Sequence, residues 1–136
     1  MPRKLKVVFD TNIYISAIIF GGSPDACLEM ARIGEIELYT SNGILLELTN
    51  KLRSKFFHTE EDIETIITAL SNFIKVVEPK IRINKIKADP SDNKILEAAV
   101  EAKVHFIVSG DKKHILPLKE FQGIKIVSAG DFIERL

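Results

Sequence analysis

The chain has 136 residues, of which 46% are hydrophobic, so it can bury a sizeable core without disulfide or metal staples. Nineteen basic residues balance 19 acidic ones, and this zero net charge excludes a broad electrostatic footprint for nucleic acid. Any contact with nucleic acid must therefore be local. Cys27 is the only cysteine, which excludes an internal disulfide and a multi-thiolate metal site. Any bound metal would be held by oxygen ligands.

No targeting or membrane segment is visible in the sequence. Residues 1–4 lead straight into a short strand, which leaves no signal-peptide core, and no apolar run approaches a membrane span. These features predict a cytoplasmic protein without a membrane segment. No repeat, low-complexity tract or linker interrupts the chain. We therefore expect residues 1–136 to form a single domain.

The first half of the chain alternates short apolar strands with helices. Residue types that cap helices follow the opening strand at Asp10, Thr11 and Asn12, and Gly21 and Gly22 break the first helix. The elements predicted here are a strand over 5–9, a helix over 11–20, a helix from Ser23-Pro24 to Gly34, a strand over 35–40, a helix from Ser41 or Asn42 to Leu52, and a helix from Thr59 to Phe73.

The second half continues the alternation. Asp89 is interpreted as a helix N-cap, with Pro90 as the first helical residue and Asp92 as the N3 acid. The segment 79–87 alternates isoleucines with basic residues and could be a strand or a loop. The remaining predicted elements are a strand over 74–77, the helix to Ala102, a strand over 104–108, a short helix or turn interrupted by Pro117, a strand over 124–127, and a final helix capped by Ser128.

Strands that alternate with helices indicate the fold class. Such a pattern favours parallel pairing through right-handed crossover connections, with the sheet buried between two helical layers. We therefore predict an α/β protein of the three-layer α/β/α type.

Carboxylates stand at the positions where such a sheet binds ligands. In open α/β sheets ligands bind outside the carboxyl ends of the strands, and Asp10 and Asp111 each come at or just after such an end. Asp92 opens the helix before the second of these strands, and Glu47 lies on the helix after the strand over 35–40. Like charges about 4 Å apart cost on the order of 4 kcal/mol per pair at an effective dielectric near 20. A hard cation such as Mg²⁺ or Mn²⁺ would relieve that repulsion and could promote phosphoryl chemistry.

Each aspartate also has a structural interpretation. Asp10 could cap the first helix, although Thr11 beside it could do so instead and leave the carboxylate free. Asp92 could only complement a helix dipole, and Asp111 belongs to an ordinary turn sequence. Asp89 is assigned to capping rather than to the site.

Glu47 is the most informative acid. It stands among leucines at 45, 46 and 48, so its carboxylate must find a partner or lie at the edge of a cleft. The histidines carry less information, because His105 is expected to be a structural residue of a strand, and His58 and His114 are expected to be exposed near turns.

Four blocks of the sequence resemble a known family when taken together and in order. They are Val8 to Asn12, Glu47 within Ser41 to Leu52, Asp89 to Asp92, and Val108 to Lys112. In order and spacing they resemble the signature blocks of the PIN-domain family, most closely the VapC-like toxin ribonucleases of prokaryotic toxin–antitoxin pairs. The resemblance implies a five-stranded, mainly parallel sheet. It also implies an endoribonuclease that depends on Mg²⁺ or Mn²⁺ and cleaves single-stranded RNA.

The resemblance also implies site residues and partners. Asp10, Glu47, Asp92 and Asp111 match the acidic quartet that binds metal and catalyses the reaction, with Thr11, Asn12 and Ser109 as supporting polar neighbours. Toxins of this family are typically homodimers inhibited by a small antitoxin protein that reaches into the acidic pocket, often with an arginine. Such a partner would be expected along residues 24–73.

Two other functions remain open from the sequence. An α/β phosphatase or phosphotransferase could use Asp10 as nucleophile, although such motifs usually have a second aspartate where Asn12 stands. A non-catalytic PIN-like binding module could also retain the four acids.

Overall fold

Strand β1 (Leu5–Phe9) lies inside the sheet of the computed structural model, which describes residues 4–136. Val7, Val8 and Phe9 are fully buried, because strands on both sides and helices on both faces cover this stretch. The strand order is β3-β2-β1-β4-β6-β5. The other strands are β2 (Ile36–Ser41), β3 (Ile74–Val77), β4 (Phe106–Val108), β5 (Glu120–Phe121) and β6 (Ile124–Val127).

The mainly parallel sheet is confirmed, with one strand more than the five expected. All pairings from β3 to β6 are parallel, and only the two-residue β5 pairs antiparallel with β6. Gln122 and Gly123 join β5 to β6 with φ values of 49° and 82°. Positive φ at both central residues is typical of the tight turn of a hairpin. Gln-Gly is a weaker hairpin signal than Asn-Gly, so the sequence did not reveal this edge strand.

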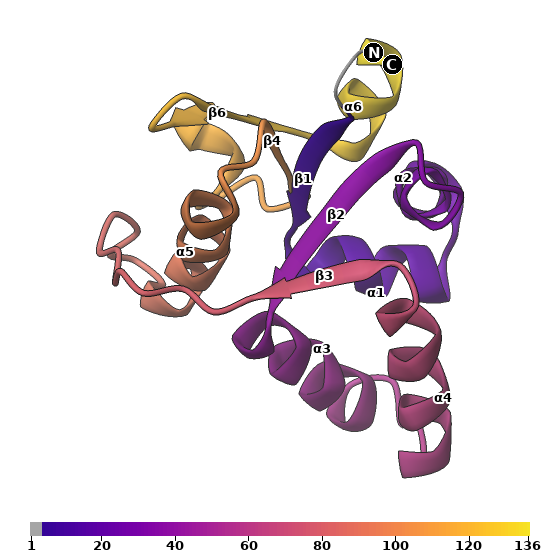
Figure 1. The fold of residues 1–136 in the computed structure, drawn as a ribbon. Helices are drawn as coiled ribbons and strands as arrows, with labels where there is room; N and C mark the ends of the chain where they lie inside the picture. The colour runs from indigo at the N-terminus through magenta and orange to yellow at the C-terminus, as the bar shows by residue number, and fades with distance from the viewer. Residues whose placement is uncertain (1–3) are drawn as a thin grey trace.

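Helices cover both faces of the sheet, as predicted. Helix α5 packs on β1 and β2, while α2 packs against both α1 and α6 (Figure 1). The helices are α1 (Thr11–Ile19), α2 (Gly22–Arg32), α3 (Asn42–Ser54), α4 (Glu60–Ser71), α5 (Asn93–Ala102) and α6 (Ala129–Arg135), with short 3-10 turns over Pro90–Asp92 and Leu116–Leu118. No helix in residues 4–136 is long and apolar enough to cross a membrane.

The order of the strands places a ligand-binding crevice beside β1. From β1 the chain steps outward to β2 and β3, then returns to add β4 on the other side of β1. The connections therefore diverge at the carboxyl ends of β1 and β4, which is where α/β sheets bind ligands. The backbone N–H of Asp10 donates to the carbonyl of Val108 at 3.0 Å and holds these two ends together.

The segment between β3 and α5 contains no strand (Figure 1). Side chains of α5 hold it against that helix. The backbone N–H groups of Lys80, Ile83 and Ile86 donate to the side chains of Glu101, Glu97 and Asn93 at 3.0, 2.8 and 2.8 Å, respectively. The Asn93 amide also donates to the carbonyls of Ile86 and Pro90 at 2.8 and 3.0 Å. Asn93 therefore ties this segment to the start of α5, next to Asp92.

We predict that Asn93→Ala lowers the free energy of unfolding by about 3 kcal/mol, because it leaves the N–H and the carbonyl of the buried Ile86 without partners, while the Pro90 carbonyl keeps the backbone N–H of residue 93. Urea unfolding followed by circular dichroism measures the loss. The matched control is Asn84→Ala at an exposed position of the same segment, which should change stability by less than about 0.5 kcal/mol. Equal losses in the two variants would contradict the role given to Asn93.

Candidate active site

Asp10 directly follows β1, and its two carboxylate oxygens have different partners. Oδ1 accepts from the backbone N–H of Ile13 at 3.0 Å and caps α1. Oδ2 accepts from the Ser109 hydroxyl and, at 3.3 Å, from the Gly110 N–H. The expectation that Thr11 could cap the helix instead is therefore wrong. Asp10 caps α1 with one oxygen and presents the other to the turn after β4.

The environment of Asp10 disfavours its charge. The side chain is only 3% exposed. Burial raises the pKa of Asp10 from 3.8 to about 6, although hydrogen bonds from Ser109, Ile13 and Gly110 act in the opposite direction. The negative charge of Asp111 raises it further. A cation bound here would therefore find a carboxylate that needs a counter-charge.

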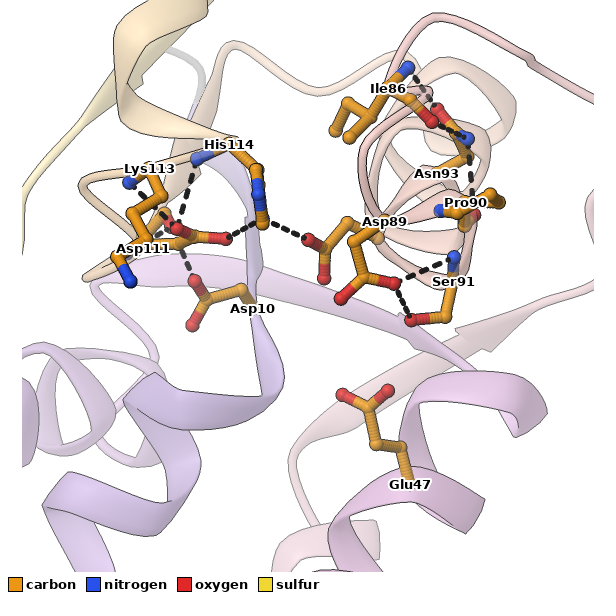
Figure 2. Close-up of polar contacts among 12 residues, drawn as sticks. Asp10, Glu47, Ile86, Asp89, Pro90, Ser91, Asn93, Asp111, Lys113 and His114 are labelled. Atoms are coloured by element: carbon orange, nitrogen blue, oxygen red, sulfur yellow. Dashed lines mark hydrogen bonds and ion pairs between the residues drawn. The ribbon is translucent and has the colours of Figure 1, made fainter.

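His114 lies between two of the predicted acids. Its Nδ1 is 3.2 Å from Asp92 Oδ2 and 3.6 Å from Asp111 Oδ2 (Figure 2). Asp111 Oδ1 accepts from the backbone N–H groups of Lys113 and His114 at 2.9 and 3.0 Å, and this turn brings the imidazole back toward the site. The expectation that His114 is exposed is therefore wrong. The Asp-x-x-His spacing after a strand was the only available signal.

The neighbouring acids influence Asp92. Burial raises the pKa of Asp92, and the negative charges of Asp89 and Asp111 raise it further, while His114 acts in the opposite direction. Asp92 thus lies in a field of like charge that a cation would relieve.

Asp89 lies nearer to this group than its assignment to capping suggests. It does accept from the Ser91 N–H at 3.2 Å and from the Ser91 hydroxyl at 2.6 Å, as a cap. The helix begins with a 3-10 turn, and the amide that Asp89 caps is that of Ser91. Asp89, Asp92 and His114 each offer one potential ligand atom, and these three atoms all lie within 4.8 Å of one another.

Glu47 reaches the site from α3 and is paired with lysines. Its carboxylate is 2.6 Å from Lys94 Nζ and 3.7 Å from Lys51 Nζ. Burial tends to raise the pKa of Glu47, but hydrogen bonds from Lys94 and Thr11 and the charges of both lysines outweigh it and lower the pKa. Lys51 also donates to the Asn12 side chain at 3.1 Å. The partner that the sequence required for Glu47 is therefore a pair of lysines. Figure 2 shows its carboxylate pointing toward the aspartates.

All four acids of the predicted quartet line one small pocket. The pocket has a volume of about 20 Å³ and is lined by Asp10, Thr11, Asn12, Glu47, Lys51, Asp92, Ile95, Asp111 and Ile115. Ser109 is fully buried behind it and reaches the site through Asp10. The structure therefore brings together every acid that the sequence singled out for this site, from four separate segments of the chain.

The donor set suits a divalent cation. A volume of about 20 Å³ accommodates one particle the size of a water molecule. The pocket offers carboxylates and no thiolate, which matches the preference of Mg²⁺ and Mn²⁺ for oxygen ligands. Thr11 Oγ1 is buried beside the pocket, where its hydrogen bond helps to lower the pKa of Glu47, so it lies among the oxygen atoms of the site.

Comparison with known families is consistent with this arrangement. Residues 6–113 match the PIN domain. The chain belongs to the PIN-domain family. This PIN domain is 38% identical over 129 residues to an uncharacterized protein of Methanocaldococcus jannaschii, a match that covers 90% of this chain and 81% of the relative.

Solved structures share the fold of this PIN domain. VapBC2 of Rickettsia felis, bound to a DNA fragment from its promoter, superposes with a TM-score of 0.62 at 13% identity, covering 90% of this chain and 97% of that chain. The sarcin-ricin loop cleaving toxin VapC20 of Mycobacterium tuberculosis superposes with a TM-score of 0.60 at 13% identity, covering 88% and 98%. At this level of identity the likeness shows the fold alone.

We predict that in EDTA at pH 8 the Asp10→Asn variant is more stable than the wild type. The pKa of Asp10 is about 6 in the folded protein and 3.8 in the unfolded chain. Its contribution to the free energy of unfolding is therefore complete below pH 3.8 and is lost as the pH rises through 6. Lowering the pH from 8 to 5 should stabilise the wild type by about 1 kcal/mol relative to Asp10→Asn.

Denaturant unfolding at the two pH values measures this difference. Asp25→Asn, an exposed change in the first turn of α2, should keep the wild-type pH dependence. A lower stability of Asp10→Asn at pH 8 would show that the hydrogen bonds from Ser109 and Gly110 to Oδ2, which an asparagine nitrogen cannot accept, outweigh the cost of burying the charge.

Proposed function

We propose that this PIN-domain protein is a metal-dependent endoribonuclease that cleaves single-stranded RNA and serves as the toxin of a toxin–antitoxin pair. The observation that carries the proposal is the lining of one pocket by Asp10, Glu47, Asp92 and Asp111 at the carboxyl ends of the strands. Because these acids come from four segments, hydrogen bonding within one turn cannot explain why they meet. A shared ligand of opposite charge can.

The aspartates are the residues best placed to hold Mg²⁺ or Mn²⁺. When bound, such an ion lowers the pKa of a water and neutralises charge that develops on a phosphoryl group during in-line attack. Asp10 supplies Oδ2, which the Ser109 hydroxyl and the Gly110 N–H keep in place. Asp92 and Asp111 supply oxygens whose positions His114 fixes.

Glu47 has a different place in this mechanism. Lys94 and Lys51 already balance its charge, so it contributes less net negative charge to an ion than the aspartates do. Its carboxylate can accept a hydrogen bond at the edge of the pocket, where the two lysines would face an incoming phosphate. We therefore assign Glu47 to the outer part of the metal site.

The structures that share the fold support the biological part of the proposal. One is a VapBC complex bound to promoter DNA, and another is a toxin that cleaves the sarcin-ricin loop. By analogy we propose an RNA substrate and an antitoxin that contacts residues 24–73. The homodimeric state and the cytoplasmic location also stay predictions.

A phosphatase that uses Asp10 as nucleophile is less compatible with the geometry. Both Asp10 oxygens accept hydrogen bonds, the side chain is almost fully buried, and its pKa is raised. Each of these features makes an attacking carboxylate less available.

We predict that Mn²⁺ raises the melting temperature by mass action, with a gain of about 2.7 kcal/mol at a concentration one hundred times the dissociation constant. Asp92→Asn should lose most of this response because it removes a ligand. The control Asp25→Asn should keep all of it. Differential scanning calorimetry in EDTA and in a Mn²⁺ series measures the effect. A full response in folded Asp92→Asn would contradict the assigned site.

We predict that Asp10→Asn and Asp92→Asn each reduce cleavage of single-stranded RNA by about a hundredfold or more, which corresponds to about 3 kcal/mol of transition-state stabilisation. Asp89→Asn should retain most activity, because asparagine caps a helix about as well as aspartate. The measurement is cleavage of a mixed RNA pool with Mn²⁺, with circular dichroism on each variant.

EDTA provides the control for this experiment. Activity that persists in EDTA, or in a folded Asp92→Asn protein, would refute the metal mechanism. A strong loss in Asp89→Asn would instead place Asp89 in the site, beside Asp92 and His114.

A further inference from the structure

The segment that follows β3 concentrates positive charge in a chain whose net charge is zero. Residues 79–87 contain four basic residues and no acidic one. All four basic side chains are exposed, and none of them forms an ion pair within residues 4–136. They are Lys80, Arg82, Lys85 and Lys87. This is a local positive surface of the kind that a neutral chain needs for contact with nucleic acid.

The segment is fixed in place even though it forms no strand. Glu97 and Glu101 of α5 could neutralise the basic side chains, but their carboxylates instead accept backbone N–H groups of the segment. Helix α5 thereby holds the segment while the lysine and arginine heads stay available. We call this set of bonds, from Asn93, Glu97 and Glu101 to the backbone at 86, 83 and 80, the α5 latch.

Two grooves run along the latched segment. The first has a volume of about 430 Å³ and lies between residues 41–43 and 77–82. The second has a volume of about 390 Å³ and lies between residues 82–84 and 90–93. Arg82, Lys94 and Glu97 line both grooves. Each volume is within the range of small-ligand sites, which is about 300–1,000 Å³.

Lys94 connects these grooves to the acidic pocket. Lys94 lines both grooves, and its ammonium lies 2.6 Å from Glu47, which lines the pocket. On the other side, Asp92 lines the pocket and the adjacent Asn93 lines the second groove. The basic grooves therefore border the acids directly.

We propose that Lys80, Arg82 and Lys94 bind the phosphate backbone of single-stranded RNA on the side of the acidic pocket where α5 begins. This proposal rests on the proposed ribonuclease function and names where its substrate lies. A pocket of carboxylates repels a polyanion, so attraction must come from cations beside it. The flanking phosphates of a flexible single strand can occupy the grooves while one phosphate reaches the acids.

The test measures RNA binding separately from cleavage. Fluorescence anisotropy of a labelled single-stranded RNA 12-mer in EDTA, over a series of salt concentrations, compares wild type with Lys80→Gln/Arg82→Gln. The control is Lys55→Gln/Lys125→Gln, two exposed lysines outside the grooves. Losing two phosphate contacts should reduce the slope of log affinity against log salt by about 1.4, which is about 25-fold in affinity at 0.1 M salt if the lines meet at 1 M.

The α5 latch provides a second test, in which the expected change in RNA affinity is opposite to the change that charge alone would cause. Removing an acid beside a basic surface should by itself strengthen RNA binding. Glu97→Gln, which keeps an acceptor for the Ile83 N–H, should therefore bind RNA at least as tightly as wild type. Glu97→Ala, which removes the acceptor, should bind RNA more weakly than Glu97→Gln, although both variants lose the same charge.

Two outcomes decide the proposal, and a third measurement tests the proposed function. Equal salt slopes for the groove double variant and the wild type would overturn it and assign the segment to another partner. Equal affinities of Glu97→Ala and Glu97→Gln would overturn the role of the latch. Cleavage with Mn²⁺, measured on the same proteins, tests the proposed function separately, because a wild type that binds but does not cleave refutes the nuclease and not the surface.

Discussion

Repulsion between carboxylates at the carboxyl ends of β1 and β4 is the constraint on which the rest of the site depends. Like charges about 4 Å apart cost on the order of 4 kcal/mol per pair at an effective dielectric near 20. Each acid therefore needs a nearby hydrogen-bond donor or positive charge. Asp10 has the Ser109 hydroxyl and the Gly110 amide, while Asp92 and Asp111 share the His114 imidazole. Glu47 has two lysines. The carboxylates are thus held in place, but the raised pKa values of Asp10 and Asp92 show that the balance is incomplete.

Much of the fold could be predicted because strong periodic signals specify it. The apolar run of β1, the caps at Ser41 and Thr59 and the stripe of α5 each depend on neighbouring residues, and the structure confirms them. The strand ends also predicted that Asp10 and Asp111 would lie at one edge, since parallel strands bring their carboxyl ends together. Glu47 and Asp92 joined them through the family resemblance.

The remaining features depend on contacts that sequence spacing does not encode. The Asp-x-x-His spacing alone does not show that the turn after Asp111 folds back and places His114 between two carboxylates. Asp10 was expected either to cap or to serve the site, yet a carboxylate has two oxygens and the structure uses one for each purpose. The segment 79–87 has the alternation of a strand, but α5 side chains satisfy the backbone N–H groups at 80, 83 and 86, so no partner strand is needed for them.

The first turns of α5 explain why the acidic pocket and the basic segment occur together. Asp92 faces the pocket, Asn93 binds the backbone of the segment, and Lys94 pairs with Glu47 while lining both grooves. Consecutive residues of a helix point about 100° apart, so three neighbours can serve three different surfaces. A shift of this turn would therefore move the acid, the latch and the bridging lysine together. The buried Asn93 opposes such a shift, because its hydrogen bonds to both Ile86 and Pro90 would have to break.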